Sequence, residues 1–502
     1  MSTVASSRGA VAPAQHEIEL KLRIPADKVD AVLAAVRGKQ GSTRTHLVAS
    51  YLDTEALDLA ANGMGWRLRR EGRRWVQTVK ATPRDGDHLA REEDNVPVKG
   101  SGRPAPDARL HIGSPAGDRL VALLGTLRTE PSERFHTDIW RVARTVRVPG
   151  GTVELAVDQG SIVSGDRSIP VCELEIELKS GNARAVVGAA HHWAQRHGLW
   201  LDAATKAHRG NMLAKDANEL PVRKAPAAEL HSQMSIDGAV REMTRVCLAQ
   251  ILGNTSAVAA GLGGHEHVHQ ARVGIRKLRT VLAEFGSSCP SVDPTWRTDL
   301  AEIFAVLGEA RDREVVLAGW LRALEREGSP KVALPQPTID HTGDALRGID
   351  FTVLMLDLLR YAHGEPDASD DDVELVAVVS ARLKDLRRTS AKRADEFKRL
   401  TIDEQHEVRK QLKRLRYVAE LTASLYGRKK VARYISALEP AQDALGSLND
   451  LSVATDLFQA LAAVDPNAWF AVGWLRSRFD ATVKSCVKPL RKAEQAKPYW
   501  SR

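Results

Sequence analysis

The first half of the chain alternates apolar and polar residues over short segments. Between His16 and about Asp216, segments such as EIELKLRI, WVQTVK, TVELAVDQG and VCELEIELK are separated by Gly, Pro and Asp. A period of two residues is typical of β-strands, because successive side chains point to opposite faces. Two stretches, Asp27–Val36 and Ala183–His197, fit helices instead. This region is therefore predicted to be rich in strands.

The second half has a helical pattern. After about Met234, apolar residues recur with a period of about 3.6 residues, and strand patterns almost vanish. The motif HQARVGIRKLR begins at His269, and HEVRKQLKRLR begins at His406, 137 residues later (406 − 269). LGEARD begins at Leu307, and LGSLND begins at Leu445, 138 residues later (445 − 307). Two motifs that share nearly one offset predict a duplicated helical unit.

These patterns divide the chain into four predicted parts. Residues 1–15 are small and polar and are expected to be disordered, and residues 16–217 form the strand-rich domain. A Pro- and Ala-containing segment predicts a linker over residues 218–234, and a helical domain follows over residues 235–498. The expected fold class is a two-domain α+β protein.

Charged residues gather on one face of several predicted strands. In EIELKLRI that face carries Glu17, Glu19, Lys21 and Arg23, and in CELEIELK it carries Glu173, Glu175, Glu177 and Lys179. Glu154 and Asp158 share a face in another strand, as do Arg67 and Arg69. An antiparallel sheet with one solvated face would explain any single strand of this kind.

The set of strands favours an inward-facing arrangement. Carboxylates in a row repel one another unless a cation lies between them, and Mg²⁺ and Mn²⁺ prefer oxygen ligands of this type. If the sheet curls so that its charged faces point inward, the acidic strands can hold metal while Arg and Lys strands hold phosphate oxygens. We therefore expect an enclosed site for a metal-bound phosphate compound.

Cations in the helical half lie beside the apolar stripe rather than opposite it. On one arc of each helix, at about 100° per residue, lie His269, Arg272, Arg276 and Arg279 in the first copy and His406, Arg409, Lys413 and Arg416 in the second. Such cations are expected at the rim of a groove between helices, where a cluster of them needs an anion. The repeated G-x-x-x-D elements, Gly308/Asp312 and Gly446/Asp450, are interpreted as helix-packing or capping features.

Composition narrows the partners and the compartment. A net charge of +8 over 502 residues favours polyanionic partners. The four cysteines are far apart and form no C-x-x-C pair, which argues against a zinc ribbon or a disulfide framework and fits a reducing cytoplasm. We find no apolar signal segment and no run of about 18 apolar residues, so a cytoplasmic protein without a membrane span is expected. No nucleic-acid motif appears, so nucleic acid is not an expected partner.

The motif E-x-E-x-K at Glu17, Glu19 and Lys21 resembles the signature of the CYTH family, the triphosphate tunnel metalloenzymes. The resemblance continues in order over about 200 residues, through YLDT, the Arg67 and Arg69 pair, Lys80, TDIWR, ELAVDQG, ELEIELKSG and TKAHRG. It implies an eight-stranded antiparallel β tunnel with flanking helices. It also implies hydrolysis or cyclisation of triphosphates with Mg²⁺ or Mn²⁺ as cofactor.

The same resemblance implies roles for single residues. The metal ligands would be Glu17, Glu19, Asp158, Glu173, Glu175 and Glu177, with Glu154 as a further candidate. The phosphate chain would be held by Lys21, Arg67, Arg69, Lys80, Arg141, Lys206 and Arg209. Glu17, Glu19 and Lys21 would be catalytic. Two points stay open: Arg134 or Arg144 could take the place of Arg141, and the glutamates of CELEIEL that contact metal are not fixed.

The motif VHQARVGIRKLR, its second copy and LGSLND resemble the CHAD domain over about Ser235 to Pro498. This resemblance implies two four-helix bundles related by pseudo-two-fold symmetry, with a central basic channel that binds inorganic polyphosphate. The two arcs of histidines and cations described above would line that channel. Inorganic triphosphate, polyphosphate and polyphosphate granules are the implied partners.

The leading hypothesis is a metal-dependent inorganic triphosphatase that converts tripolyphosphate to pyrophosphate and phosphate, with a helical domain that binds polyphosphate. Alternatives are a nucleotidyl cyclase, an organic triphosphatase acting on thiamine triphosphate or RNA 5′ ends, and a non-catalytic polyphosphate-binding scaffold. The fold alone does not separate them, because one fold supports several substrates. The complete set of Glu17, Glu19 and Lys21 favours an enzyme.

Overall fold

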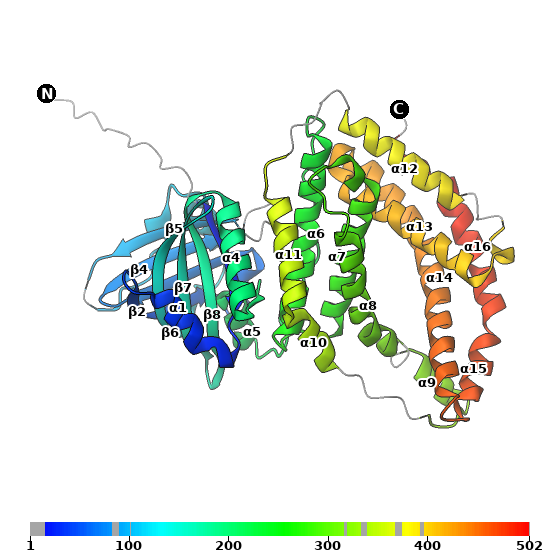
Figure 1. Cartoon of the computed structure of the whole chain (residues 1–502), viewed down its shortest axis with the longest axis horizontal. Helices are drawn as coiled ribbons and strands as arrows, with labels where there is room; N and C mark the ends of the chain where they lie inside the picture. The colour runs from blue at the N-terminus through cyan, green and yellow to red at the C-terminus, as the bar shows by residue number, and fades with distance from the viewer. Residues whose placement is uncertain are drawn as a thin grey trace. The chain divides into compact units, whose positions relative to one another are not determined.

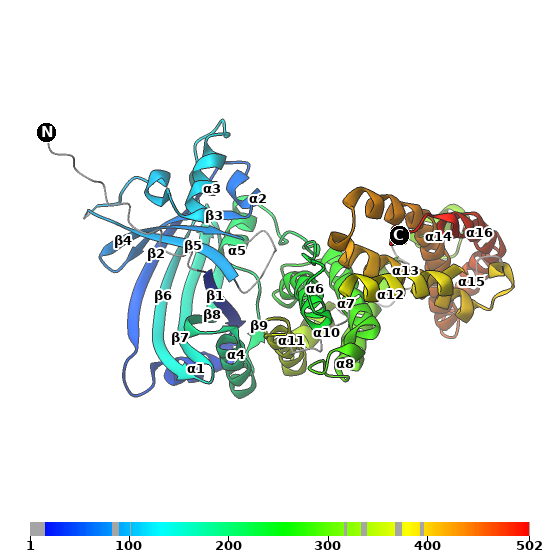
Figure 2. The same cartoon turned by 90° about the horizontal axis from the view of Figure 1, so that it is seen from above.

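The computed structural model describes residues 16–82, 90–100, 102–315, 319–332, 339–366, 374–391 and 396–500. The chain divides into two compact units (Figures 1 and 2). One comprises residues 1–221 with 347–356, and the other comprises residues 222–346 with 357–502. The boundaries predicted for the linker, 218–234, stay a prediction.

The first unit is built on an antiparallel sheet. Its strands are β1 (His16–Arg23), β2 (Thr43–Asp53), β3 (Met64–Glu71), β4 (Arg74–Ala81), β5 (Ala90–Val98), β6 (Ser132–Val148), β7 (Gly151–Ser164), β8 (Arg167–Gly181) and β9 (Trp200–Leu201). The order is β5-β4-β3-β2-β6-β7-β8-β1-β9, and all pairs are antiparallel. β1 also pairs with β5 through residues 16–18, so the sheet closes on itself. Closure gives the sheet an inner and an outer face.

The sheet therefore has nine strands in the described residues, rather than the eight expected. The additional strand, β9, contains only Trp200 and Leu201 and pairs with the end of β1. A two-residue strand has no alternation that a sequence pattern could reveal. The coarser expectation of a two-domain α+β protein is confirmed.

Helices pack on the outer face of the sheet (Figure 2). They are α1 (Val29–Arg37), α2 (Asp58–Ala61), α3 (Pro115–Leu124) and α4 (Ala183–His197), with the 3₁₀ segments η1 (Ala26–Lys28) and η2 (Ala108–His111). Helix α5 (Lys206–Ala214) lies instead on the inner side of the sheet, where its first residue, Lys206, contacts Asp158 of β7. Strand β3 shows why the apolar side chains lie on the outer face. Its residues Trp66 and Leu68 are buried there, and Trp66 joins a hydrophobic core beneath α3 that includes Leu120. The alternate residues, Arg67 and Arg69, point to the inner face.

From residue 236 onward, every regular element in the described ranges is a helix. These are α6 (Ile236–Ala259), α7 (His265–Glu284), α8 (Trp296–Val315), α9 (Leu321–Arg326), α10 (Ile339–Arg347), α11 (Ile349–Ala362), α12 (Leu375–Ala391), α13 (Ile402–Leu421), α14 (Arg428–Leu461), α15 (Ala468–Arg476) and α16 (Phe479–Gln495), with η3 (Gly286–Ser288), η5 (Phe397–Arg399) and η6 (Ala423–Leu425). No helix in the part of the chain that the structure describes is long and apolar enough to cross a bilayer.

The sequence repeat falls on equivalent pairs of helices. His269 lies on α7 and His406 on α13, while Leu307 lies on α8 and Leu445 on α14. α7 packs against α8, α13 packs against α14, and α7 contacts α13. The two copies of the repeat thus meet through their first helices.

Candidate functional site

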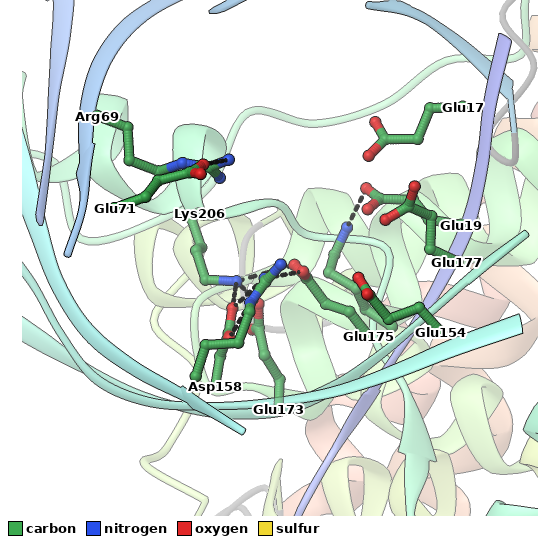
Figure 3. A network of polar contacts seen from close by, with 12 residues as sticks. Glu17, Glu19, Arg69, Glu71, Glu154, Asp158, Glu173, Glu175, Glu177 and Lys206 are labelled. Carbon is green, nitrogen blue, oxygen red and sulfur yellow. Dashed lines mark hydrogen bonds and ion pairs between the residues drawn. The ribbon is translucent and has the colours of Figure 1, made fainter. Parts of the chain in front are cut away.

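Strand register places charged side chains in rows across the inner face of the sheet. Directly paired residues of an antiparallel sheet point to the same side. Asp158 of β7 pairs with both Arg141 of β6 and Glu173 of β8. Two residues along, Glu175 pairs with Lys21 of β1. Charges that are distant in the sequence therefore converge (Figure 3).

Asp158, Glu173 and Glu175 form an acidic triad on this inner face. Each offers an oxygen within 4.8 Å of the others. The Lys206 ammonium lies between them, 2.6 Å from an oxygen of Asp158, 2.6 Å from Glu173 and 2.8 Å from Glu175 (Figure 3). Arg141 adds two hydrogen bonds to Asp158, both 2.7 Å, and an ion pair with Glu175. The triad is thus bound by cations of the chain itself.

Helix α5 delivers Lys206 and a second cation to this triad. Thr205 caps the helix with a reciprocal capping box that includes His208. The fully buried Arg209 donates to the fully buried Glu173. Gly210 allows α5 to approach β6, because a Cβ at this position would lie 2.1 Å from the ring of Phe135.

The pKa values of the triad reflect these contacts. Burial would raise the pKa of the Glu173 carboxyl, but the charges of Arg209 and Lys206 outweigh it and lower that pKa to about 2. Burial is likewise overcome at Glu175, where Lys206 and Arg141 hold the pKa well below its usual range. Both carboxylates therefore remain ionised near neutral pH.

A second set of carboxylates, the acidic row, consists of Glu154, Glu177 and Glu19. These residues pair directly across β7, β8 and β1, so they lie side by side (Figure 3). Lys179 lies 2.7 Å from Glu177 and 3.5 Å from Glu154, and Lys21 lies 3.5 Å from Glu19. Glu154 and Glu177 are 26% and 28% exposed, so an ion from solvent can reach the row.

Glu17 lies next to this row and takes part in another ion-pair group. The Lys80 ammonium contacts Glu17 and also Glu93, the latter at 2.9 Å. Burial raises the pKa of Glu17 to about 8, with Lys80 opposing and Glu19 reinforcing the shift. Burial would also raise the pKa of Glu93, but Lys80 and a hydrogen bond from Glu17 hold it well below its usual range. The two carboxyls share a side-chain hydrogen bond, which requires that one of them carries a proton.

Arg67 and Arg69 occupy the opposite part of the inner face. Arg69 pairs with Glu71, and Arg67 lies 3.7 Å from Glu93. The Nε atoms of both guanidiniums are buried and have no hydrogen-bond partner in the described part of the protein. Buried donors of this kind are normally satisfied, so an acceptor oxygen of a ligand or of a water molecule is expected beside each.

The donor chemistry of the inner face fits a hard divalent cation, because its ligands are carboxylate oxygens. The acidic triad is the tightest group among the described residues. However, the ammonium of Lys206 stands where a metal ion would bind in that group. The acidic row has fewer cations around it and is more exposed, so we regard it as the better fit.

The structure gives Arg141 and Arg144, two of the three arginines that the sequence left as alternatives, different surroundings. Arg141 faces the acidic triad, whereas Arg144 donates to the carbonyl of Ala35 in α1 on the outer face.

Asp53 and Thr54 of the YLDT motif hold a turn: the Asp53 carboxylate accepts from the backbone N–H groups of Thr54, Leu59 and Ala60.

Glu71 and Glu93 were not predicted as site residues. Glu93 lies in AREEDNVPV, where Glu92 and Asp94 on the outer face bind Arg119 and His111. Both faces of that strand therefore carry acidic residues, and alternation alone could not show which of them lie on the inner face. Glu71 shares a face with Arg67 and Arg69, so the same alternation could have found it.

In the helical unit, four cations lie close together: Arg272 and Arg276 of α7, and Arg409 and Lys413 of α13. We call them the basic cluster. Burial and the charges of Arg276, Arg409 and Arg272 lower the pKa of Lys413 to about 6, although Asp450 of α14 opposes the shift. The Nε atom of Arg276 is buried without a hydrogen-bond partner in the described residues.

Two of the cations predicted to bind polyphosphate, Arg279 and Arg416, have other neighbours. Burial lowers the pKa of Arg279, and the nearby charges of Arg297 and Arg414 lower it further. Arg416 pairs with Glu420 and donates to Gln442 at 2.6 Å.

The histidines predicted to bind polyphosphate are half-buried. Burial lowers the pKa of His406, and the neighbouring charges of Lys410 and Arg409 lower it further. His269 is half-buried on α7. Of the G-x-x-x-D residues, the side chain of Asp312 lies outside the described residues.

Comparison with known proteins identifies both halves. The CYTH domain family matches residues 15–210, and the CHAD domain family matches residues 242–459. An inorganic triphosphatase of Haemophilus influenzae is 30% identical over 166 residues, which cover 33% of this chain and 45% of that protein. An uncharacterized protein of Mycobacterium tuberculosis is 28% identical over 341 residues, covering 62% of this chain and 61% of that protein. The chain thus spans less than two thirds of these relatives.

Two solved structures are similar to parts of the chain. The CHAD domain of Ricinus communis is 26% identical, with a TM-score of 0.44, and covers 56% of this chain and 98% of that one. A putative adenylyl cyclase of Hippeastrum, described as having a dominant triphosphatase activity, is 19% identical with a TM-score of 0.30 and covers 40% of this chain and 96% of that one. The two family matches confirm the resemblances found in the motifs: the chain contains a CYTH domain followed by a CHAD domain.

Proposed function

We propose that this protein is a metal-dependent inorganic triphosphatase whose CHAD domain binds polyphosphate. The observation that carries the proposal is the closed sheet whose inner face holds carboxylates and cations in one site (Figure 3). A triphosphate carries about four to five negative charges, so an enclosed site must supply cations to hold it. The triphosphatase named among the relatives supports the same reaction class.

The metal, Mg²⁺ or Mn²⁺, is proposed to bind at the acidic row of Glu19, Glu154 and Glu177, with Glu17 beside it. When bound, it supplies charge neutralisation and a water of lowered pKa for hydrolysis. Asp158, Glu173 and Glu175 are proposed instead to hold Lys206, Arg141 and Arg209 in place. This assignment revises the broader ligand set expected from the sequence, because each member of the triad already contacts a cation.

The phosphate chain is proposed to lie between the acidic row and the cations facing it. Lys80, Arg67 and Arg69 face the interior from β3 and β4, and the buried Nε donors of Arg67 and Arg69 are available to phosphate oxygens. Lys206 and Arg141 approach from the other side. Binding by fixed charges positions the terminal phosphoryl group and stabilises charge that develops in the transition state.

The CHAD domain is proposed to consist of two duplicated four-helix bundles whose basic cluster binds polyphosphate. The charges of Arg276, Arg409 and Arg272 lower the pKa of Lys413, so an anion bound among these residues would be favoured. A flexible chain of phosphates matches this need and agrees with the expected partner. Residues from both copies of the repeat would contact one anion, since α7 and α13 meet.

A phosphate-release assay tests the enzymatic proposal. The full chain is incubated with tripolyphosphate, ATP or thiamine triphosphate, with Mg²⁺, with Mn²⁺ or with chelator. Release from tripolyphosphate with metal, and none with chelator, is expected. Cyclic nucleotide formation or preference for thiamine triphosphate would replace the proposed substrate, and binding without any release would indicate a scaffold.

Calorimetric titration with Mn²⁺ in the absence of substrate tests the metal assignment. Glu177→Gln is expected to weaken Mn²⁺ binding about tenfold, because the acidic row loses a charged ligand. Asp158→Asn is the matched comparison and is expected to bind Mn²⁺ within about threefold of wild type. The opposite ranking would assign the metal to the acidic triad.

A further inference from the structure

The guanidinium of Arg272 is held by two residues of α8. Its Cζ lies 4.2 Å from the ring centroid of Phe304, and its Nη1 donates to the Phe304 carbonyl at 3.3 Å. Gly308, one turn further along α8, leaves the space that this group occupies. A Cβ at Gly308 would lie 2.5 Å from Nη1, 3.5 Å from Cζ and 3.6 Å from Nη2 of Arg272.

Gly308 differs from a glycine that lets two helices approach. At Gly274 of α7, an added Cβ would meet Ile251 of α6, including its backbone nitrogen at 3.3 Å. At Gly308 the three nearest atoms all belong to the end of the Arg272 side chain, and none belongs to a backbone. The absence of a side chain at Gly308 therefore serves the guanidinium rather than helix packing. This differs from the helix-packing or capping interpretation of the sequence motif.

The position of Arg272 matters because it belongs to the basic cluster. Arg272 lies close enough to Lys413 of α13 to affect its pKa, together with Arg276 and Arg409. Arg276 also approaches the same ring, with its Cζ 5.7 Å from the Phe304 centroid. An aromatic face attracts a cation without neutralising its charge. Phe304 can thus hold the Arg272 guanidinium in place through both its ring and its carbonyl oxygen.

The second copy of the repeat lacks this arrangement. The offset of 138 residues places Gln442 where the first copy has Phe304 (304 + 138) and Gly446 where it has Gly308 (308 + 138). Gln442 accepts from Arg416 and donates to the carbonyl of Leu412. An added Cβ at Gly446 would meet no atom within 4 Å. The same motif thus has different surroundings in its two copies.

We propose that Phe304 and Gly308 are positioning residues, which hold the guanidinium of Arg272 so that the basic cluster is set for a linear polyphosphate before it binds. The inference rests on the proposed binding of polyphosphate by the CHAD domain. It assigns an unequal role to the two copies: in the first, Phe304 and Gly308 fix a guanidinium of the basic cluster, whereas in the second the equivalent Gln442 binds Arg416, outside that cluster.

Binding of sodium polyphosphate to the full chain tests this inference, with Gly308→Ala and its matched control Gly446→Ala. Gly308→Ala is expected to bind about tenfold more weakly, since one charge-assisted contact is displaced. Gly446→Ala is expected to bind as wild type. Both should keep the wild-type melting temperature or exceed it, because alanine favours a helix and the displaced atom is the end of a flexible side chain. The salt dependence of binding should become shallower only for Gly308→Ala.

Phe304 provides a second test that does not depend on Gly308→Ala. Phe304→Leu is expected to weaken binding about threefold, and Phe304→Tyr, which keeps the aromatic face, should restore it. Equal binding by wild type, Gly308→Ala and Phe304→Leu would overturn the inference while leaving polyphosphate binding intact. Equal losses in Gly308→Ala and Gly446→Ala would also overturn it. Failure of the wild-type chain to bind polyphosphate would overturn the proposed function itself.

Discussion

The cations of the two domains have opposite surroundings. In the closed sheet, Lys206 touches three carboxylates and Arg141 touches two. In the helical unit, the nearest charges that shift the pKa of Lys413 are mainly other cations. A cation among carboxylates is stabilised before any ligand arrives, whereas a cation among cations is stabilised when an anion binds. The first arrangement suits a site of fixed geometry, and the second suits a surface that captures a polyanion.

Removing a cation from the sheet should have the largest effect. Lys206→Met should lower the free energy of unfolding by about 3 kcal/mol, because Asp158 and Glu173 would be left buried with less compensation. Urea denaturation measures the change. Lys179→Met is the matched control: Lys179 also touches two glutamates but is 37% exposed, and a loss below about 1 kcal/mol is expected. Equal losses would show that burial does not distinguish the two lysines.

The acidic row gives the next largest expected effect. Glu19→Gln should lower the rate of tripolyphosphate hydrolysis about 100-fold, through loss of a carboxylate proposed to hold the metal. Steady-state phosphate release at saturating Mg²⁺ is the measurement. Glu92→Gln, on the outer face of β5, serves as the control and should stay within about twofold of wild type. Activity of Glu19→Gln close to wild type would contradict the role proposed for the row.

Removing a cation from the basic cluster should have the reverse effect on stability. Lys413→Met is expected to raise the free energy of unfolding by about 1 kcal/mol at about pH 5, where Lys413 is protonated in both the folded and unfolded states. The same change should weaken polyphosphate binding about fivefold. Thermal denaturation and calorimetric titration measure the two effects. Destabilisation by Lys413→Met would show that the cluster is satisfied without a ligand.

The smallest effect concerns pH. The pKa of Lys413 is lowered to about 6 in the folded protein, and a bound polyanion would raise it. The complex then holds more protons than the free protein, so affinity should rise as pH falls from about 8 toward 6, by roughly fivefold. Lys413→Arg stays charged and should show a shallower pH dependence, because only polyphosphate and the neighbouring histidines would still titrate. Identical pH profiles for the two proteins would contradict the linkage.

The lowered pKa of Lys413 also makes the folding stability depend on pH. Between about pH 6 and the ordinary pKa of a lysine, the unfolded chain binds more protons than the folded one at this position. The contribution of Lys413 to stability therefore rises with pH across that window. Below about pH 6 the repulsion with Arg276 and Arg409 is present in full.

Sequence patterns predicted the inner face well where alternation is clean. In β1 and β8 every second residue is charged, and these are the residues that register brings together. In β5 both faces carry acidic residues, so Glu93 could not be separated from Glu92 and Asp94 without knowing what covers the outer face. The contact that places Lys206 inside the acidic triad also depends on how α5 packs, which alternation does not encode.

In the helical unit, the repeat predicted the two sets of cations but not how they are divided. Arg272, Arg276, Arg409 and Lys413 are brought together, whereas Arg416 pairs with Glu420. The role inferred for Gly308 could not be found from its motif, because Gly446 carries the same motif with open space around it. Positions that are equivalent in sequence differ here in their neighbours on other helices.

The alternation of β8 has a consequence for how this protein can change. Each position from Glu173 to Lys179 contributes either to the inner charges or to the apolar outer layer. Single substitutions alter one side chain, but insertion or deletion of one residue within β8 would exchange the two faces over the remainder of the strand. Carboxylates would then enter the apolar layer and leucines the inner face. We infer that length changes are confined to the turns, and that this strand varies only by replacement.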